Sequence, residues 1–369
     1  MLYDFGPWHP LRPERIPAGM GLLKAAGLWD AEQESLGAEE ANQADLLLVH
    51  DRDYVNAVIQ GGIPSVSSHY GFASVDNPPF PRMHYAASLM SGGAVKAART
   101  VMDGSVTHAF HPAGGWHHAL PARASGFCIY NDPAVAAAVL ARDYGASVLY
   151  IDLDCHHGDG VQWMFYDRAD IYTVSLHESG RFLFPGTGDV TEIGEGAGRG
   201  FCLNVPFLPF TTDGDWRDAL DVIIPTLAEQ FRPDIILSNH GCDTHVWDPI
   251  THLALTTDSL RYQASLMHGL AHELCDGRWL AVGSGGYDWR RVVPRSWAIL
   301  WAEMSGRSLP NALPTEWAKE WLTDAEKPHP STFLDPPEMV GITPGAEESS
   351  RGNRATIGQA AERLVVLER

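Results

Sequence analysis

Short apolar runs alternate with amphipathic segments between residues 86 and 304, and this alternation restricts the possible folds more than any other feature. The runs with the length and composition of strands are 147–154, 171–177, 234–239 and 278–286. The candidate helices are 86–103, 134–144, 215–231, 258–274 and 291–304. Apolar strands separated by amphipathic helices form a buried, mostly parallel sheet. The sequence therefore predicts an α/β fold.

The two ends of the chain lack this pattern. The first 75 residues mix candidate helices at 18–28 and 43–60 with Pro- and Gly-containing loops. After residue 305 the chain becomes rich in proline and acidic residues, which favours loops over a packed core. We expect a mobile linker over 341–356 and a short helix over 357–369.

The charge of the chain excludes some partners. Lys and Arg number 26 and Asp and Glu number 46, which gives a net charge of −20. A surface this acidic repels a phosphate backbone, so we do not expect nucleic-acid binding. A small basic or acylated substrate remains compatible, because a local site can differ from the global field.

The sequence also favours a cytoplasmic protein with no membrane anchor. No run approaches the roughly 18 apolar residues of a membrane helix, and the N-terminal residues do not resemble a secretory signal. The five cysteines are scattered and include no CxxC pair, which argues against a disulfide framework or a cysteine zinc site.

The segment YIDLDCHHGDG (150–160) is the strongest candidate for chemistry. If the strand stays extended, Asp152, Asp154 and His156 project to the same side, because side chains alternate along a strand. An imidazole and carboxylates that converge at a strand end suit a borderline metal such as zinc. The alternative is a solvated turn, but two adjacent histidines and three aspartates within this segment favour a functional site.

Three further segments follow other apolar runs or precede a helix: GGWHHAL (114–120), SNHGCDTHVWDP (238–249) and VGSGGYDW (282–289). Adjacent histidines can form an acid/base pair, and a phenol on a glycine-rich turn can donate to a developing oxyanion. Each segment alone also fits a structural role, such as a turn or helix cap for Asp243 or a packing aromatic for Tyr287. Their shared position is informative, since ligands of parallel sheets gather beyond the carboxyl ends of the strands.

Together and in this order, these segments resemble the zinc-dependent histone deacetylase superfamily. The resemblance covers most of 1–304 and includes HPLRPERI (9–16), GGAVKAA (92–98), VSLH (174–177) and FPGTGDV (184–190). RASGFCIYND (123–132) and DPITHL (248–253) are most similar to the bacterial acetoin-utilisation (AcuC-type) branch.

The resemblance implies an arginase/deacetylase-like three-layer fold with a mostly parallel central sheet flanked by helices. It implies one deacetylase catalytic domain at 1–325. Residues 326–369 would form a Pro/acid-rich C-terminal tail, partly mobile with a terminal helix.

For the cofactors, the resemblance implies that Asp154, His156 and Asp243 bind Zn²⁺, with Fe²⁺ as an alternative ion in cells. An open fourth position would mark the zinc site as catalytic. A structural K⁺ is expected near Asp152, His156 and Ser175.

For catalysis, the resemblance implies that His118 is the general base for a water molecule and then the acid for the departing amine. His117 would support it electrostatically. Asp159 and Asp152 would hydrogen-bond His118 and His117 and fix their tautomers. Tyr287 would donate its hydroxyl to the tetrahedral oxyanion.

For substrate binding, the resemblance implies a narrow tunnel for the aliphatic stem of an acylated lysine. Phe127 and Phe184 would flank this tunnel, and Gly126 would leave room beside it. Ile250 would line the rim, and Asp76 would accept hydrogen bonds from the substrate backbone.

The function implied is a zinc-dependent deacetylase that hydrolyses the acetyl amide of acetyl-lysine in proteins and releases acetate. A deacetylase of small acetylated amines such as acetylpolyamines is the nearest alternative. A binuclear manganese ureohydrolase would need further bridging aspartates, and a non-catalytic acyl-lysine reader would have lost Tyr287 or a metal ligand.

Overall fold

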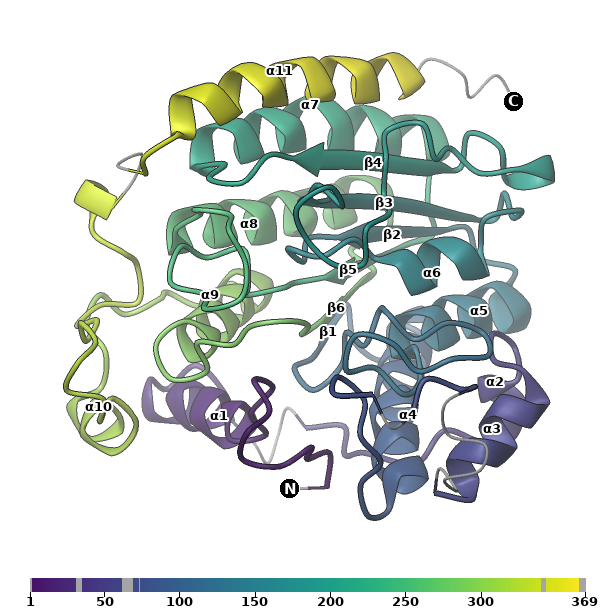
Figure 1. Cartoon of the computed structure of the whole chain (residues 1–369), viewed down its shortest axis with the longest axis horizontal. Helices are drawn as coiled ribbons and strands as arrows, with labels where there is room; N and C mark the ends of the chain where they lie inside the picture. The colour runs from purple at the N-terminus through teal and green to yellow at the C-terminus, as the bar shows by residue number, and fades with distance from the viewer. Residues whose placement is uncertain (1, 31–34, 62–68, 73, 340–342, 365–369) are drawn as a thin grey trace.

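The computed structural model describes residues 2–30, 35–61, 69–72, 74–339 and 343–364 (Figure 1). Its centre is a six-stranded sheet with the strand order β1-β6-β5-β2-β3-β4. Every neighbouring pair of strands is parallel. The strands are β1 His108–His111, β2 Val148–Asp152, β3 Ile171–Glu178, β4 Cys202–Phe207, β5 Ile235–Asn239 and β6 Trp279–Val282. The predicted parallel sheet is confirmed.

Helices surround the sheet and connect its strands. Their bounds are α1 Arg15–Ala25, α2 Gln43–Leu46, α3 Arg52–Ile59, α4 Met83–Met102, α5 Asp132–Tyr144, α6 Asp159–Met164, α7 Asp213–Phe231, α8 Thr257–Leu274, α9 Val293–Ser305, α10 Thr315–Trp321 and α11 Ala346–Arg363. The five helices expected between residues 86 and 304 correspond to α4, α5, α7, α8 and α9. Strands β1 and β4 were not among the expected apolar runs.

The sheet is buried between two helical layers, as the alternation along β2 shows. Leu149 and Ile151 belong to the core that includes side chains of α7, α8 and α11. Val148 and Tyr150 point the other way, into a core formed with the alanine-rich α4 and α5. Adjacent residues of a strand face opposite sides of the sheet, so a fully apolar strand requires cover on both. The three-layer fold is therefore confirmed (Figure 1).

The C-terminal helix begins earlier than the composition indicates. We expected a linker over 341–356, whereas α11 starts at Ala346 and packs along α7 and β4 (Figure 1). Its buried side chains include Ile357 and Ala360. Residues 341, 342 and 365–369 lie outside the described residues, and the domain boundary at residue 325 remains a prediction.

Polar contacts explain why a polar sequence forms this helix. The Asn353 side chain accepts a hydrogen bond from the Leu208 backbone N–H at 3.0 Å and donates to an Asp215 carboxylate oxygen at 3.0 Å. Such bonds satisfy buried polar groups, so the helix can dock without a broad apolar face. Composition does not reveal these partners.

Among the described residues, no helix is long and apolar enough to cross a membrane.

Because all strands run the same way, their carboxyl ends share one edge of the sheet. The loops after β1, β2, β5 and β6 leave this edge. They contain the four segments that the sequence singles out.

Candidate active site

The centre of the site is a buried cluster of Asp154, His156 and Asp243. Asp154 and His156 follow β2, and Asp243 follows the neighbouring strand β5. His156 Nδ1 lies 3.0 Å from an oxygen of Asp154 and 3.0 Å from an oxygen of Asp243. The backbone N–H groups of Gly285 and Cys155 hold the two carboxylates, at 2.8 Å for Asp154 and 2.9 Å for Asp243.

The electrostatics of this cluster favour a cation. Burial and the neighbouring charge of Asp154 raise the pKa of Asp243 to about 6. Burial alone would lower the pKa of His156, but hydrogen bonds to Asp154 and Asp243 raise it well above its usual value. Two carboxylates and one imidazole nitrogen within this space form a donor set that suits a divalent ion. The cluster can therefore hold a metal ion.

Two glycines leave the space that this cluster occupies. A Cβ atom on Gly285 would lie 2.1 Å from Asp243 Oδ2, and one on Gly241 would lie 2.6 Å from Asp154 Oδ2. Any larger residue at either position would displace a carboxylate. The glycine-rich turns of the sequence thus have a steric purpose.

Two histidine–carboxylate pairs lie beside the cluster. His117 Nδ1 lies 2.8 Å from Asp152 Oδ2, and His118 Nδ1 lies 2.7 Å from Asp159 Oδ1. The two imidazole rings are 4.0 Å apart. Since each carboxylate accepts from Nδ1, the Nε2 atom of each ring is left for other partners.

The two histidines differ in charge. Burial would lower the pKa of His117, but the carboxylates of Asp152 and Asp154 raise it to about 9. Burial and the charges of His117 and His156 lower the pKa of His118 well below its usual value. These opposite shifts favour the protonated form of His117 and the neutral form of His118, which can accept a proton.

Several buried groups that hold this arrangement were not predicted. Asn239 Nδ2 donates to Asp152 Oδ1 at 2.9 Å, and the Tyr150 hydroxyl donates to Asp152 Oδ2 at 2.5 Å. Asp132 accepts from the Trp116 backbone N–H at 2.8 Å, which fixes the loop before the histidine pair. The one available signal was the position of Asn239 at a strand end.

A small cavity of about 20 Å³ connects these groups. Its lining includes His117, His118, Asp154, His156 and Tyr287. The Tyr287 ring lies 6.5 Å from the His156 ring between centroids.

Asp248 sits behind Tyr287. Its carboxylate accepts a hydrogen bond from the Tyr287 backbone N–H at 2.9 Å. Burial and the charge of Asp243 raise the pKa of Asp248 well above its usual value. Asp248 lies in the DPITHL segment, but no sequence pattern indicates its contact with Tyr287.

Aromatic rings surround the approach to the cavity. The Phe184 ring is 5.0 Å from the His118 ring and 43% exposed, and the Phe127 ring is 5.9 Å from that of Tyr287. Gly126 has a φ of +50°, and a Cβ atom there would lie 2.4 Å from His118 Cδ2.

Two expected rim residues lie apart from the described residues that line the cavity. The Asp76 side chain is exposed, and its carbonyl contacts His9 Nε2 at 3.3 Å. The Ile250 backbone N–H donates to Asp248 Oδ1 at 3.1 Å.

Residues expected to bind K⁺ lie on neighbouring strands near the end of β2. Asp152 and Ser175 are register partners on β2 and β3. The Ser175 hydroxyl lies 2.9 Å from His177 Nδ1 and 3.4 Å from the Gly158 backbone N–H. The K⁺ itself remains a prediction.

The three-layer fold and the carboxylate–imidazole cluster beside a histidine pair define the arginase/deacetylase class of hydrolases. A family model described as "Histone deacetylase domain" matches residues 9–304, and the chain belongs to the histone deacetylase family.

Known relatives agree over nearly the whole chain. Acetoin utilization protein AcuC of Bacillus subtilis (strain 168) is 42% identical over 362 residues, covering 97% of this chain and 93% of the relative. The AcuC protein of Staphylococcus aureus (strain MSSA476) is 38% identical over 357 residues, covering 95% and 92%.

Solved structures agree as well. An HDAC homologue complexed with SAHA has a TM-score of 0.86 and 30% identity, and the match covers 97% of this chain and 96% of that chain. An HDAC homologue from Aquifex aeolicus has a TM-score of 0.82 and 29% identity, covering 95% and 96%. The predicted family and hydrolase class are confirmed: the protein is a deacetylase of a metal-dependent family.

Proposed function

We propose that this deacetylase uses zinc to hydrolyse the acetyl amide of acetyl-lysine side chains in proteins, releasing acetate. The carrying observation is that His118, whose Nδ1 faces Asp159, lines the same cavity as Asp154 and His156. A proton acceptor and a metal-binding cluster at one cavity suit the attack of water on an amide.

The proposed metal ligands are Asp154, His156 and Asp243. Zinc held there would polarise the acetyl carbonyl and acidify the attacking water. Two carboxylate charges balance a divalent ion, and zinc accepts both oxygen and nitrogen donors. The same donor set would also hold Fe²⁺ in cells, and a structural K⁺ near Asp152, His156 and Ser175 belongs to the same proposal.

His118 accepts a proton from the attacking water at Nε2, because its Nδ1 faces Asp159. It then delivers this proton to the amine as the C–N bond breaks, so acetate and a free lysine amine leave. His117 is kept protonated by Asp152, and its positive charge stabilises the negative charge that develops on the oxyanion. Tyr287 donates its hydroxyl to the oxyanion.

The approach to the cavity supports the proposed substrate class. Phe127 and Phe184 offer apolar faces to the methylene groups of a lysine stem, and Gly126 leaves room beside His118. Phe184 reaches solvent, which suits a stem whose backbone stays outside. Ile250 and Asp76 are the proposed contacts for that backbone. Acetylated proteins as partners and a cytoplasmic location are part of this proposal.

The test compares kcat/KM on an acetyl-lysine peptide and on an acetylpolyamine with the same zinc-loaded protein. The proposal predicts a clear preference for the peptide. A higher kcat/KM for the acetylpolyamine would identify small acetylated amines as the substrate class. Hydrolysis of neither compound would overturn both substrate assignments.

A further inference from the structure

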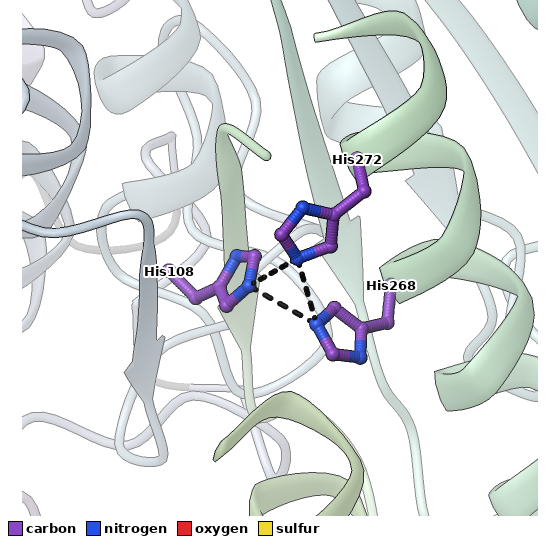
Figure 2. Close-up of side chains that lie close together, drawn as sticks. All are labelled: His108, His268 and His272. Atoms are coloured by element: carbon purple, nitrogen blue, oxygen red, sulfur yellow. Dashed lines mark hydrogen bonds between the residues drawn. The ribbon is translucent and has the colours of Figure 1, made fainter. Parts of the chain in front are cut away.

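A second group of possible metal ligands lies outside the candidate active site. His108 begins β1, and His268 and His272 are one turn apart on α8. The three imidazoles point toward one another from the strand and the helix, as Figure 2 shows. We propose that His108, His268 and His272, here called the triad, form a second metal site. This site would bind one divalent ion that prefers imidazole ligands, such as Zn²⁺.

The distances between the three Nε2 atoms match those between ligands of one metal ion. The Nε2 atom of His108 lies 3.1 Å from that of His268 and 3.2 Å from that of His272, and the last two are 3.1 Å apart. For zinc–nitrogen bonds of ~2.0–2.1 Å at tetrahedral angles, neighbouring ligand nitrogens are ~3.3 Å apart. The triangle thus has nearly the edge length that a bound ion requires.

Hydrogen bonding alone does not satisfy this triangle. A neutral imidazole carries a single N–H, so three Nε2 atoms that face one another cannot all be paired by donors and acceptors. Protonating all three would place like charges about 3 Å apart, which is unfavourable. One cation at the centre accepts all three lone pairs and removes the conflict.

The surrounding residues hold the imidazoles in place. The Trp279 indole stacks on the His268 ring at 5.9 Å with an interplanar angle of 25°, and meets the His108 ring edge-on at 5.9 Å. Gly277 has a φ of +81°, and a Cβ atom there would lie 2.4 Å from Thr107 Cγ2 and 3.2 Å from the His272 ring. The turn before β6 is thereby kept close to the triad.

The three imidazoles are accessible to a metal ion. His108 and His268 are partly buried and His272 is exposed, so water can complete the coordination shell.

The triad is separate from the proposed catalytic metal. His108 and its register partner Trp279 are the first residues of parallel strands, so they lie at the amino edge of the sheet. The catalytic candidates follow the opposite, carboxyl edge. Strand β1 is four residues long and lies at one end of the sheet order. The bound ion would join this strand to α8.

The experiment counts zinc per chain after dialysis of the full-length protein against a nanomolar zinc buffer. The wild type is expected to hold two ions. His272→Gln, at an exposed helix position, and Asp243→Asn should each hold one, and the combined variant none. The expected loss of affinity at the triad in His272→Gln is roughly 100-fold or more, since even indirect ligand supports contribute 10–100-fold. His329→Gln, an exposed histidine elsewhere, is the matched control and should keep two.

Asp243→Asn weakens the catalytic cluster, and its remaining ion is assigned to the triad by its loss in the combined variant. Zinc should also raise the unfolding temperature of Asp243→Asn, and adding His272→Gln should abolish this shift. The single His272→Gln variant should hydrolyse the acetyl-lysine peptide at the wild-type rate. Equal zinc counts in Asp243→Asn with and without His272→Gln would overturn the proposal.

Discussion

His118 Nδ1 lies 2.7 Å from Asp159 Oδ1, and both side chains are buried. Asp159 begins α6, so a helix start fixes the tautomer of a loop histidine 41 residues away. Replacing the carboxylate by an amide would retain the shape but offer His118 an alternative partner through the amide N–H.

Asp159→Asn is therefore expected to lower kcat on an acetyl-lysine peptide by roughly 10–100-fold, the usual effect of losing such a support. KM should change little, because Asp159 does not line the cavity. Steady-state kinetics measure both values. Asp167→Asn, an exposed aspartate, is the control. An unchanged kcat in Asp159→Asn would argue against His118 as the base.

Gly285→Ala is expected to weaken metal binding at the catalytic cluster. Its Cβ atom would lie 2.1 Å from Asp243 Oδ2, so the carboxylate must move. Competition with a chromophoric zinc chelator should show an affinity loss on the order of 10–100-fold. Gly269→Ala, where nothing lies within 4 Å of the new Cβ, should bind zinc like the wild type. Equal affinities for both variants would contradict the proposed ligand set.

The dependence of kcat on pH should be bell-shaped. Activity requires neutral His118, whose pKa is lowered by burial and neighbouring imidazoles, so the acid limb should lie below the usual histidine value of about 6.5. It also requires protonated His117, whose pKa of about 9 places the alkaline limb near pH 9. In Asp152→Asn the alkaline limb should shift to lower pH, because the carboxylate that holds the proton is gone. A profile with no alkaline limb in the wild type would rule out a role for the His117 cation.

Asp335→Ala is expected to destabilise the protein by roughly 3–5 kcal/mol, since it leaves a buried Arg295 without its counter-charge. The two side chains are 2.7 Å apart and 1% and 0% exposed. Urea unfolding measures the change. Glu39→Ala is the control, because its side chain is 75% exposed in its pair with Lys96. A small loss of unfolding free energy in Asp335→Ala would mean that the contact of the tail with α9 contributes little to stability.

The same pair predicts acid sensitivity. Burial alone would raise the pKa of Asp335, but the hydrogen bond from His245 and the charge of Arg295 hold it well below its usual range. The folded-state pKa is depressed, so this stabilisation is present above the unfolded value of about 4 and is lost as pH falls below it.

The central part of the fold was predictable because hydrophobic periodicity and the alternation of strands and helices can be read along the chain. The run before Asp154 and the run before Asp243 are apolar and short, and parallel strands must end at one edge. Periodicity therefore places these segments at one edge of the sheet, and the resemblance to a known family identifies Asp154, His156 and Asp243 within them as metal-ligand candidates.

The remaining features depend on contacts between distant segments. Strand β1 carries a histidine at each end, so it lacks an apolar pattern, and its His108 meets α8 160 residues later. Asp335 lies in a Pro- and acid-rich stretch, and only packing shows that it pairs with Arg295. The role of Asp248 is likewise visible only in the structure, because its carboxylate contacts the backbone N–H of Tyr287.

The most direct test of the account is acetate release from an acetyl-lysine peptide by zinc-loaded wild type and Tyr287→Phe, with bound zinc counted in both. The wild type should release acetate stoichiometrically with free lysine. Tyr287→Phe should retain the same zinc and lose on the order of 100- to 1,000-fold in kcat, the effect of removing one oxyanion donor. Equal turnover by the two proteins, or no acetate release by the zinc-loaded wild type, would contradict it.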